Sequence, residues 1–247
     1  MSSASIKSLG PVLSAYERRA RLAPGLLVIA PIADLVVALG FDKYPIVAGV
    51  LGLVSLGAGG FVLSLFVGNF GRAVEPALYR SWGGKPTTQL LRRDGSLQTA
   101  IRRETRRAAI QKVTGIKFLS ARAERRYGSR ADELIDLAIS QVRPLGRRSE
   151  FPLIEQESAQ YGFERNLFAV RWIGRAATYA SLLGFAIGFL LLPEHYSVSS
   201  VVGVIVCLAI TAFWSFAPSA ERTRMAGFRY AEQLLNAVVT ASRRTGE

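Results

Sequence analysis

The stretch Ser81–Thr88 is the most distinctive candidate for chemistry, and it reads Ser-Trp-Gly-Gly-Lys-Pro-Thr-Thr. Two glycines before a lysine are typical of loops whose backbone N–H groups hold a phosphate. The full phosphate-loop pattern needs glycine at position 79 and serine or threonine at position 86, but the chain has Tyr79 and Pro86 there. A nucleotide hydrolase is therefore not favoured. The stretch is interpreted either as a rigid turn that docks Trp82 against helices or as a phosphate contact.

A dense basic run follows this stretch, on a helix that is predicted to extend from an N-cap at Ser96 to Thr114. Neighbours such as Arg103 and Arg107 lie on one helix face and repel each other unless an anion is close. That anion is either the lipid headgroups, which attract juxtamembrane basic residues, or a nucleotide or nucleic acid. The candidate residues for binding an anion or ligand are Lys85, Thr87, Thr88, Arg92, Arg93, Arg102, Arg103, Arg106 and Arg107.

A second motif, Tyr161-Gly162-Phe163-Glu164-Arg165-Asn166, comes shortly before an apolar run that begins at Trp172. A helix that starts near Pro152 is predicted to continue through this motif into the apolar run, where it would transmit a cytoplasmic rearrangement to the membrane. The alternative is a connector whose aromatic side chains pack at the membrane interface. The candidate coupling residues are Tyr161, Phe163, Arg165 and Asn166.

The residue types needed for most catalytic or metal sites are scarce. Cys207 is the only cysteine and His195 the only histidine, so an intrachain disulfide and a Cys/His metal centre are excluded. The sequence places no acid–base pair and no nucleophile beside a histidine. We therefore expect a protein that is not an enzyme and that needs no cofactor or metal.

Four apolar runs dominate the rest of the chain. Each holds roughly 20 residues, and at about 1.5 Å per residue a helix of that length crosses a hydrocarbon layer of about 30 Å. Short polar links join the first to the second and the third to the fourth. The fold class predicted is an all-α membrane protein with four transmembrane helices arranged as two hairpins. The runs are Leu22–Phe41, Ile46–Phe70, Trp172–Leu192 and Val198–Pro218.

Charge predicts the orientation of these hairpins. The chain of 247 residues has a net charge of +13, and the segment Gly71–Arg171 holds twenty Lys and Arg against eleven Asp and Glu. Because basic residues stay on the cytoplasmic side, this segment and both termini are predicted to be cytoplasmic. The predicted parts are an amphipathic segment at 1–21, hairpin one at 22–70, a basic helical cytoplasmic domain at 71–171, hairpin two at 172–218 and a C-terminal cytoplasmic helix at 219–247.

Asp34 is the only ionisable residue deep in a predicted span. A carboxylate there is costly and should face protein or water rather than lipid. It is interpreted either as the polar lining of an ion or proton path, which would be a pore residue, or as a protonated side chain that is hydrogen-bonded to a neighbour such as Tyr179.

Small residues recur at four-residue spacing along three of the spans, which is the pattern that lets membrane helices approach closely. Such ridges either pack one hairpin against the other within one chain or hold several copies together as a homo-oligomer. The candidate packing residues are Gly60, Ser64, Gly68, Ala180, Gly184, Gly188 and Gly203.

Three motifs together carry a resemblance to a known family. They are W-G-G-x-P-T-T-x-x-L-R at Trp82–Arg92, F-P-L at Phe151 and Y-G-F-x-R-N at Tyr161–Asn166. The chain resembles a family of uncharacterised bacterial membrane proteins with four helices in the inner membrane. The resemblance implies the bacterial inner membrane and brings no catalytic residues. It also implies an association with defence-rich regions of bacterial genomes, which favours an anti-phage role.

Two functions follow as hypotheses. The first is an oligomeric membrane effector whose cytoplasmic domain senses a nucleotide, nucleic acid or protein signal and whose helices then form a pore or disrupt the bilayer. The second is a non-conducting anchor or scaffold that recruits a cytoplasmic protein partner. In either case the lipid bilayer, with its anionic headgroups, is a partner of the basic segments.

The predicted orientation can be tested with epitope tags. A tag inserted at Lys43 or His195 should be reached by antibody from outside intact cells or spheroplasts, whereas a tag within 71–171 should be reached only after lysis. A tag at Lys43 that reacts only after lysis would contradict the orientation derived from the basic residues.

Overall fold

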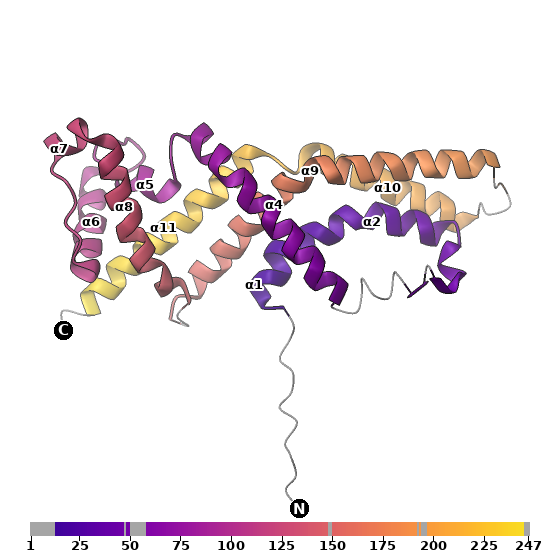
Figure 1. Cartoon of the computed structure of the whole chain (residues 1–247), viewed down its shortest axis with the longest axis horizontal. Coiled ribbons are helices and arrows are strands. Elements are labelled where there is room, and N and C mark those ends of the chain that lie inside the picture. Colours follow the sequence, from indigo (N-terminus) through magenta and orange to yellow (C-terminus); the bar gives the residue numbers. More distant parts are fainter. Residues whose placement is uncertain are drawn as a thin grey trace, which may run out of the picture. The chain divides into compact units, whose positions relative to one another are not determined.

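The computed structural model describes residues 13–46, 48–49, 58–147, 150–191, 193 and 197–244, and every regular element in these ranges is a helix (Figure 1). The predicted all-α class is confirmed for this part of the chain. Two compact units are present, the first formed by Met1–Ala73 with Arg165–Ser219 and the second by Val74–Glu164 with Ala220–Glu247. Two helices, α4 (Ala58–Trp82) and α9 (Pro152–Leu191), contribute residues to both units.

The first unit begins with a continuous helical run. Ser14 starts it with a capping box, in which its Oγ accepts from the amide of Glu17 and the Glu17 carboxylate accepts from the amide of Ser14. The run ends where Gly40 adopts a left-handed conformation, at φ +74°, which an L side chain rarely takes. Its parts are α1 (Ala15–Glu17), the π-helical turn η1 (Arg18–Leu22) and α2 (Ala23–Ala38), and the 3₁₀ turn η2 (Phe41–Lys43) follows.

Three helical runs are long and apolar enough to cross a membrane, namely Ala15–Ala38, Pro152–Leu191 and α10 (Val198–Phe216). Between 22% and 28% of the most apolar window in each is buried inside the chain, so most of this apolar surface points outward. Large apolar side chains such as Leu190 and Phe216 are among those exposed. A soluble protein rarely leaves so much contiguous apolar surface in water, so this is the character of a membrane protein.

The number of spans stays a prediction. The second predicted run, Ile46–Phe70, includes positions 47 and 50–57, which lie outside the described residues. From Ala58 onward this run is helical as the first part of α4. The hairpin arrangement, the bacterial inner membrane and the cytoplasmic termini likewise remain predictions.

Small residues in the first unit make close contacts within one chain. A Cβ on Gly184 of α9 would lie 2.6 Å from Leu35 Cδ2 of α2, and one on Gly203 of α10 would lie 2.7 Å from Ala38 Cβ. Gly68 of α4 lies against the Arg21 side chain in the same way. The other candidate packing residues divide into Gly60, Ser64 and Gly188, which are buried, and Ala180, which is exposed. Gly68, Gly184 and Gly203 thus serve packing within the chain, and a homo-oligomer remains a prediction.

The second unit is a helical domain with its own core. It contains α5 (Pro86–Leu91), α6 (Ala100–Thr114), α7 (Ala121–Arg126), α8 (Gly128–Val142), the 3₁₀ turn η3 (Arg143–Arg147) and α11 (Ala220–Arg244), together with parts of α4 and α9. The N-cap of α6 is Thr99, whose Oγ1 accepts from the Arg102 amide, so the predicted cap at Ser96 is wrong. Residues 93–98 form instead a loop whose carbonyls are used by Arg103, which delays the start of the helix.

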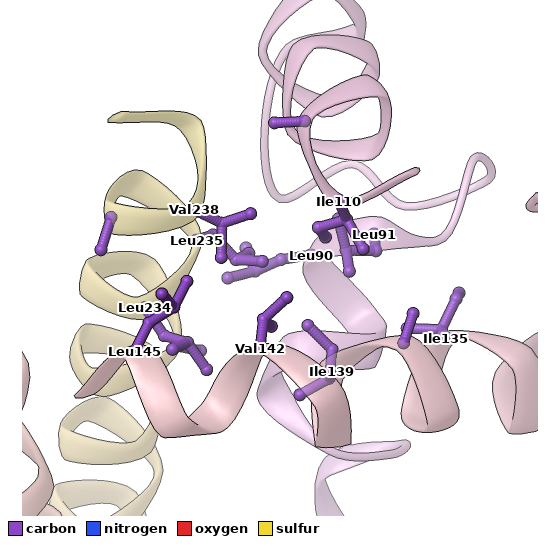
Figure 2. Packing of buried hydrophobic residues seen from close by; sticks show 14 of the residues in the cluster. Leu90, Leu91, Ile110, Ile135, Ile139, Val142, Leu145, Leu234, Leu235 and Val238 are labelled. Atoms are coloured by element: carbon purple, nitrogen blue, oxygen red, sulfur yellow. The ribbon is translucent and has the colours of Figure 1, made fainter. Parts of the chain in front are cut away.

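The core of this unit gathers side chains from α5, α6, α8 and α11. Figure 2 shows Leu91, Ile110, Ile139 and Leu235 lying toward a common centre from these four helices. All four are buried almost completely. The charged helix α6 is therefore held in place by a narrow apolar stripe that includes Ile110.

Two isoleucines on α6 provide a matched test of this core. Ile110 is 0% exposed and Ile101 is 82% exposed. We expect Ile110→Ala to lower stability by about 2–5 kcal/mol, because it leaves a cavity, whereas Ile101→Ala should leave stability almost unchanged. Unfolding of the full chain in detergent, followed by circular dichroism, measures both. Equal effects of the two substitutions would contradict the placement of α6.

Candidate functional site

A charged cleft in the second unit is the best candidate for a ligand site. Its volume is about 460 Å³, and it is bordered by the loop after α5 and by α6, α7 and α8. Four arginines and four carboxylates line it, so its formal charge is balanced and it is not a simple anion hole. The lining residues are Arg92, Arg93, Asp94, Ala100, Arg103, Glu104, Ala121, Glu124, Arg125, Gly128, Ala131 and Asp132.

Polar residues of the stretch Ser81–Thr88, together with Arg92 just after it, join the α5 region to α8. The Arg92 guanidinium forms a two-pronged ion pair with Asp132, with Nε donating to Oδ1 at 2.7 Å, and this hydrogen bond raises the pKa of Arg92. Lys85 pairs with Asp136, and Thr88 Oγ1 donates to Asp136 Oδ1 at 2.8 Å. Thr87, the remaining candidate in this motif, is buried. Lys85, Thr88 and Arg92 therefore already have partners within the chain.

Arg103 shapes the wall of the cleft. Its guanidinium donates to the main-chain carbonyls of Arg93, Gly95 and Gln98, which belong to the loop between α5 and α6. A single buried side chain thereby fixes the path of this loop. We conclude that Arg103 positions the loop, and its side chain is not open to an external anion.

Arg106 and Arg107 are core residues, each 1% exposed. Arg106 donates to Gln98 Oε1 at 2.6 Å and to Asn236 Oδ1 of α11 at 2.9 Å. Burial lowers its pKa to about 10, which still leaves it charged at neutral pH. Arg107 donates to the Leu91 carbonyl at 2.8 Å and pairs with Glu124, and burial lowers its pKa as well. Both cations are consumed by the fold.

Arg93 is the cleft arginine whose exposed partner, Glu104, an outside anion can replace. Its Nη1 lies 3.0 Å from Glu104 Oε1, and its Nε lies 3.8 Å from Glu124 Oε1. The Arg93 side chain is 35% exposed and that of Glu104 is 48% exposed. An ion pair with this much solvent contact contributes little, so another anion can replace the Glu104 carboxylate. Arg125 is exposed beside it and makes no hydrogen bond or ion pair with any described residue.

Five of the nine predicted anion-binding residues lie at two different places on the second unit. Arg92, Arg93 and Arg103 come together at the cleft. Arg102 and Arg106 lie instead on another face of α6, where Arg102 Nη1 is 3.7 Å from Glu232 Oε1 of α11. Of the nine, Arg93 and Arg102 keep partly exposed guanidinium groups beside partners that an outside anion can displace.

Tyr161 of the coupling motif belongs to a hydrogen-bonded junction in the second unit. The hydroxyls of Tyr79 and Tyr161 both donate to Glu75 Oε1 at 3.0 Å, and the two hydroxyl oxygens lie 3.1 Å apart. The Tyr161 ring also stacks on Tyr230, with centroids 6.3 Å apart. This junction therefore joins α4, α9 and α11. Sequence analysis missed Glu75, Tyr79 and Tyr230, although the four-residue spacing of Glu75 and Tyr79 on one helix face was a usable signal.

Asn166 forms a second junction, in the first unit. It is 0% exposed, its Nδ2 donates to the Ala20 carbonyl at 2.6 Å, and its Oδ1 accepts from Arg165 Nη2 at 3.3 Å. Ala20 belongs to the π-helical turn, where the usual backbone pairing is displaced. A Cβ on Gly71 would lie 1.7 Å from Asn166 Oδ1, so α4 needs glycine at this contact. Phe163, the fourth candidate of this motif, is half-buried.

Asp34 lies half-buried on α2. Its Oδ2 is shielded from solvent and has no hydrogen-bond partner among the described residues. The buried Cys207 thiol of α10 is close enough to interact with it electrostatically. Tyr179 is exposed, and no hydrogen bond between it and Asp34 occurs in the described part of the chain. A carboxyl oxygen without a partner in an apolar bundle is costly, which keeps Asp34 a candidate polar site.

Comparison with models of protein families, with curated proteins and with solved structures finds no match for this chain. The resemblance drawn from the three motifs therefore stays a prediction. Within the described ranges, no three His, Cys, Asp or Glu side chains come together as metal ligands would. The function has to be argued from the geometry of the chain itself.

Two glycines provide a matched test of the Asn166 junction. Gly71→Ala should destabilise the chain, because its Cβ collides with Asn166, whereas Gly128→Ala, on α8, meets no atom within 4 Å and should be neutral or stabilising by up to about 1 kcal/mol. In the double variant Gly71→Ala/Asn166→Ala the collision is absent, so its stability loss should be smaller than the sum of the single losses. Thermal unfolding in detergent measures these differences. Full additivity would contradict the junction.

Proposed function

We propose that this chain is an oligomeric effector of the bacterial inner membrane, with phage infection as its setting, in which a cytoplasmic domain receives a signal and the apolar helices then form a pore or disturb the bilayer. One observation carries the proposal. Two helices, α4 and α9, run through both units, and α9 is also one of the described helical runs that are apolar enough to cross a membrane. A change in the domain therefore has a direct covalent route to the membrane.

The cleft favours a small anionic signal. A volume of about 460 Å³ lies within the range of about 300–1,000 Å³ that small-molecule pockets occupy. A phosphate group would take the place of the Glu104 carboxylate on Arg93, with Arg125 as a second cation. The displaced carboxylate then needs a donor of its own. A nucleotide has phosphates that can bind Arg93 and Arg125, and its base has N–H groups that can donate to the displaced Glu104 carboxylate. It therefore suits the cleft better than a simple anion does.

The two junctions on α9 support the coupling step. Tyr161 lies in the second unit and Asn166 in the first, five residues further along one unbroken helix. A displacement of α9 that follows ligand binding would alter the hydrogen bonds at both junctions. Asp34, with its unpartnered carboxyl oxygen, would gain water or a counter-ion when the apolar helices rearrange. We assign it the role of the polar membrane site.

A non-conducting anchor is the second candidate function. It is favoured by exposed apolar side chains on the second unit, namely Ile101 of α6, Leu137 of α8 and Leu153 of α9. Such side chains suit a cytoplasmic protein partner. The use of Gly184 and Gly203 for packing within the chain also leaves fewer small residues for an oligomeric pore.

Membrane potential in expressing cells tests the proposal. During phage infection, cells with the natural chain should depolarise, and a voltage-sensitive dye reports this. Arg93→Ala should remove most of the response, because it deletes the replaceable ion pair, and so should Asp34→Leu. Arg130→Ala is the matched control, because Arg130 is an exposed arginine of α8 without a described partner, and it should respond normally.

The same experiment distinguishes the anchor. If natural cells keep their potential but survive infection, and if Ile101→Asp abolishes survival, the chain acts by recruiting a partner. Depolarisation that persists in both Arg93→Ala and Asp34→Leu would remove the proposed mechanism.

A further inference from the structure

A groove on the first unit lies beside the end of α10 and is independent of the charged cleft. Its volume is about 440 Å³, and its lining is Trp172, Arg175, Ala176 and Tyr179 of α9 with Ser215 of α10. These residues belong to the helical runs that are apolar enough to cross a membrane, near the end of each run that is predicted to be cytoplasmic. The groove therefore lies at the depth where lipid headgroups meet hydrocarbon, if that orientation holds.

The Arg175 guanidinium is held rigidly at this groove. Its Nε donates to the Trp214 carbonyl at 3.0 Å and its Nη2 to the Ser215 carbonyl at 3.4 Å, which places it over the C-terminal end of α10. Its carbon Cζ lies 4.7 Å from the centre of the Trp172 ring. An arginine carries five N–H donors, and these two contacts leave the other three available to a ligand.

A second guanidinium lies one turn earlier on α9. Arg171 Cζ is 3.7 Å from the Phe168 ring centre and 5.5 Å from that of Trp172, and Arg171 Nη1 donates to the Phe168 carbonyl at 2.6 Å. The Trp172 ring thus has two guanidinium groups beside it, that of the preceding residue Arg171 and that of Arg175 in the next turn. These contacts neutralise neither cation.

The lack of a carboxylate partner separates this pair from the arginines of the second unit. Among the described residues, Arg171 and Arg175 form no ion pair, whereas Arg92 and Arg107 each have an acidic partner. A cation at the edge of a hydrocarbon layer is costly unless an anion or water reaches it. In a bilayer, the anion at that depth is the phosphate of a lipid.

The aromatic side chains complete the site. Trp172 is 62% exposed and Tyr179 is 54% exposed, and both are residues that prefer the headgroup level of a membrane. Apolar side chains on the same helix, including Leu183 and Ile187, continue outward along α9 and are exposed too. They offer a surface on which acyl chains can lie below a headgroup that is bound at the arginines.

We infer that this groove is a binding site for an anionic phospholipid, whose phosphate accepts hydrogen bonds from Arg175 and whose glycerol region lies against Trp172 and Tyr179. Arg171 does not line the groove but lies beside the same Trp172 ring, and it serves as a second cation that attracts the headgroup. The assignment needs only that α9 and α10 lie in a bilayer, so it holds for an effector and for an anchor alike. A basic pocket between helices on the cytoplasmic side is a recurrent form of lipid recognition.

Trp172 itself reports on the site. Of the three tryptophans it is the exposed one, since Trp82 is 9% exposed and Trp214 is fully buried. The full chain is reconstituted in phosphatidylcholine vesicles that contain a minor fraction of either brominated phosphatidylglycerol or brominated phosphatidylcholine, whose bromines quench nearby tryptophan. We expect stronger quenching by the brominated phosphatidylglycerol, and Trp172→Phe should abolish the difference between the two lipids.

The arginine variants decide whether the preference comes from this site. Arg171→Gln and Arg175→Gln should each reduce the preference about fivefold, the factor that corresponds to about 1 kcal/mol for one juxtamembrane charge. Arg130→Gln, an equal change of charge on α8, should leave it intact. Arg175→Lys should keep part of it, whereas a purely structural role for Arg175 at the end of α10 predicts equal losses for Lys and Gln. Circular dichroism checks that each variant is folded.

Two results would overturn the inference. One is equal quenching by the two brominated lipids in the natural chain, or a preference that survives in the folded Arg171→Gln variant. The other is loss of the preference on addition of inorganic phosphate at constant ionic strength, because the site would then bind a soluble anion rather than a lipid.

Discussion

Burying a guanidinium group costs several kcal/mol unless its donors are satisfied, and the second unit is organised around this requirement. Arg106 and Arg107 lie in its core with 1% exposure, and their Nη donors engage carbonyls, a carboxylate and two amides, while the Nε of each has no hydrogen-bond partner among the described residues. These bonds fix the loop between α5 and α6 and tie α6 to α11. The same loop and α6 border the cleft, so the shape of the cleft depends on two arginines, Arg106 and Arg107, that do not line it.

The parts of the fold that could be predicted from the sequence are those that depend on local patterns of residues. Hydropathy predicted apolar runs at Leu22–Phe41, Trp172–Leu192 and Val198–Pro218, because a helix in lipid has to be apolar along its length. These runs overlap the three described helical runs that are apolar enough to cross a membrane. The unbroken helix from Pro152 was also predicted, and no proline occurs between residues 153 and 191 to interrupt it. The start of α6 was predicted wrongly, because both Ser96 and Thr99 are good N-cap residues and the sequence does not show that Arg103 bonds the carbonyls of the preceding loop.

The site was less predictable than the fold. The basic run indicated an anion, but the carboxylates that meet it come from far along the chain: Asp132 and Asp136 lie about 40 to 50 residues after Arg92 and Lys85. A single sequence does not specify such pairs. The coupling role of Tyr161–Asn166 stays a prediction, and the partners of Tyr161 and Asn166, Glu75 and Gly71, became visible only in the structure, which brings α4 and α9 together. The basic run pointed to residues that line the cleft, and three-dimensional pairing determined which of their charges have partners within the chain.

The π-helical turn at Arg18–Leu22 has a consequence for how the N-terminal helix should be interpreted. A π turn is equivalent to one residue inserted into an α-helix, and each residue of an α-helix advances by about 100°. A helical wheel drawn straight through Ala15–Ala38 therefore misassigns the faces on one side of the turn by about that angle. A helical wheel has to leave out one residue at the turn. A related sequence that lacks one residue at this point could therefore keep the same residues facing outward and inward along the whole helix.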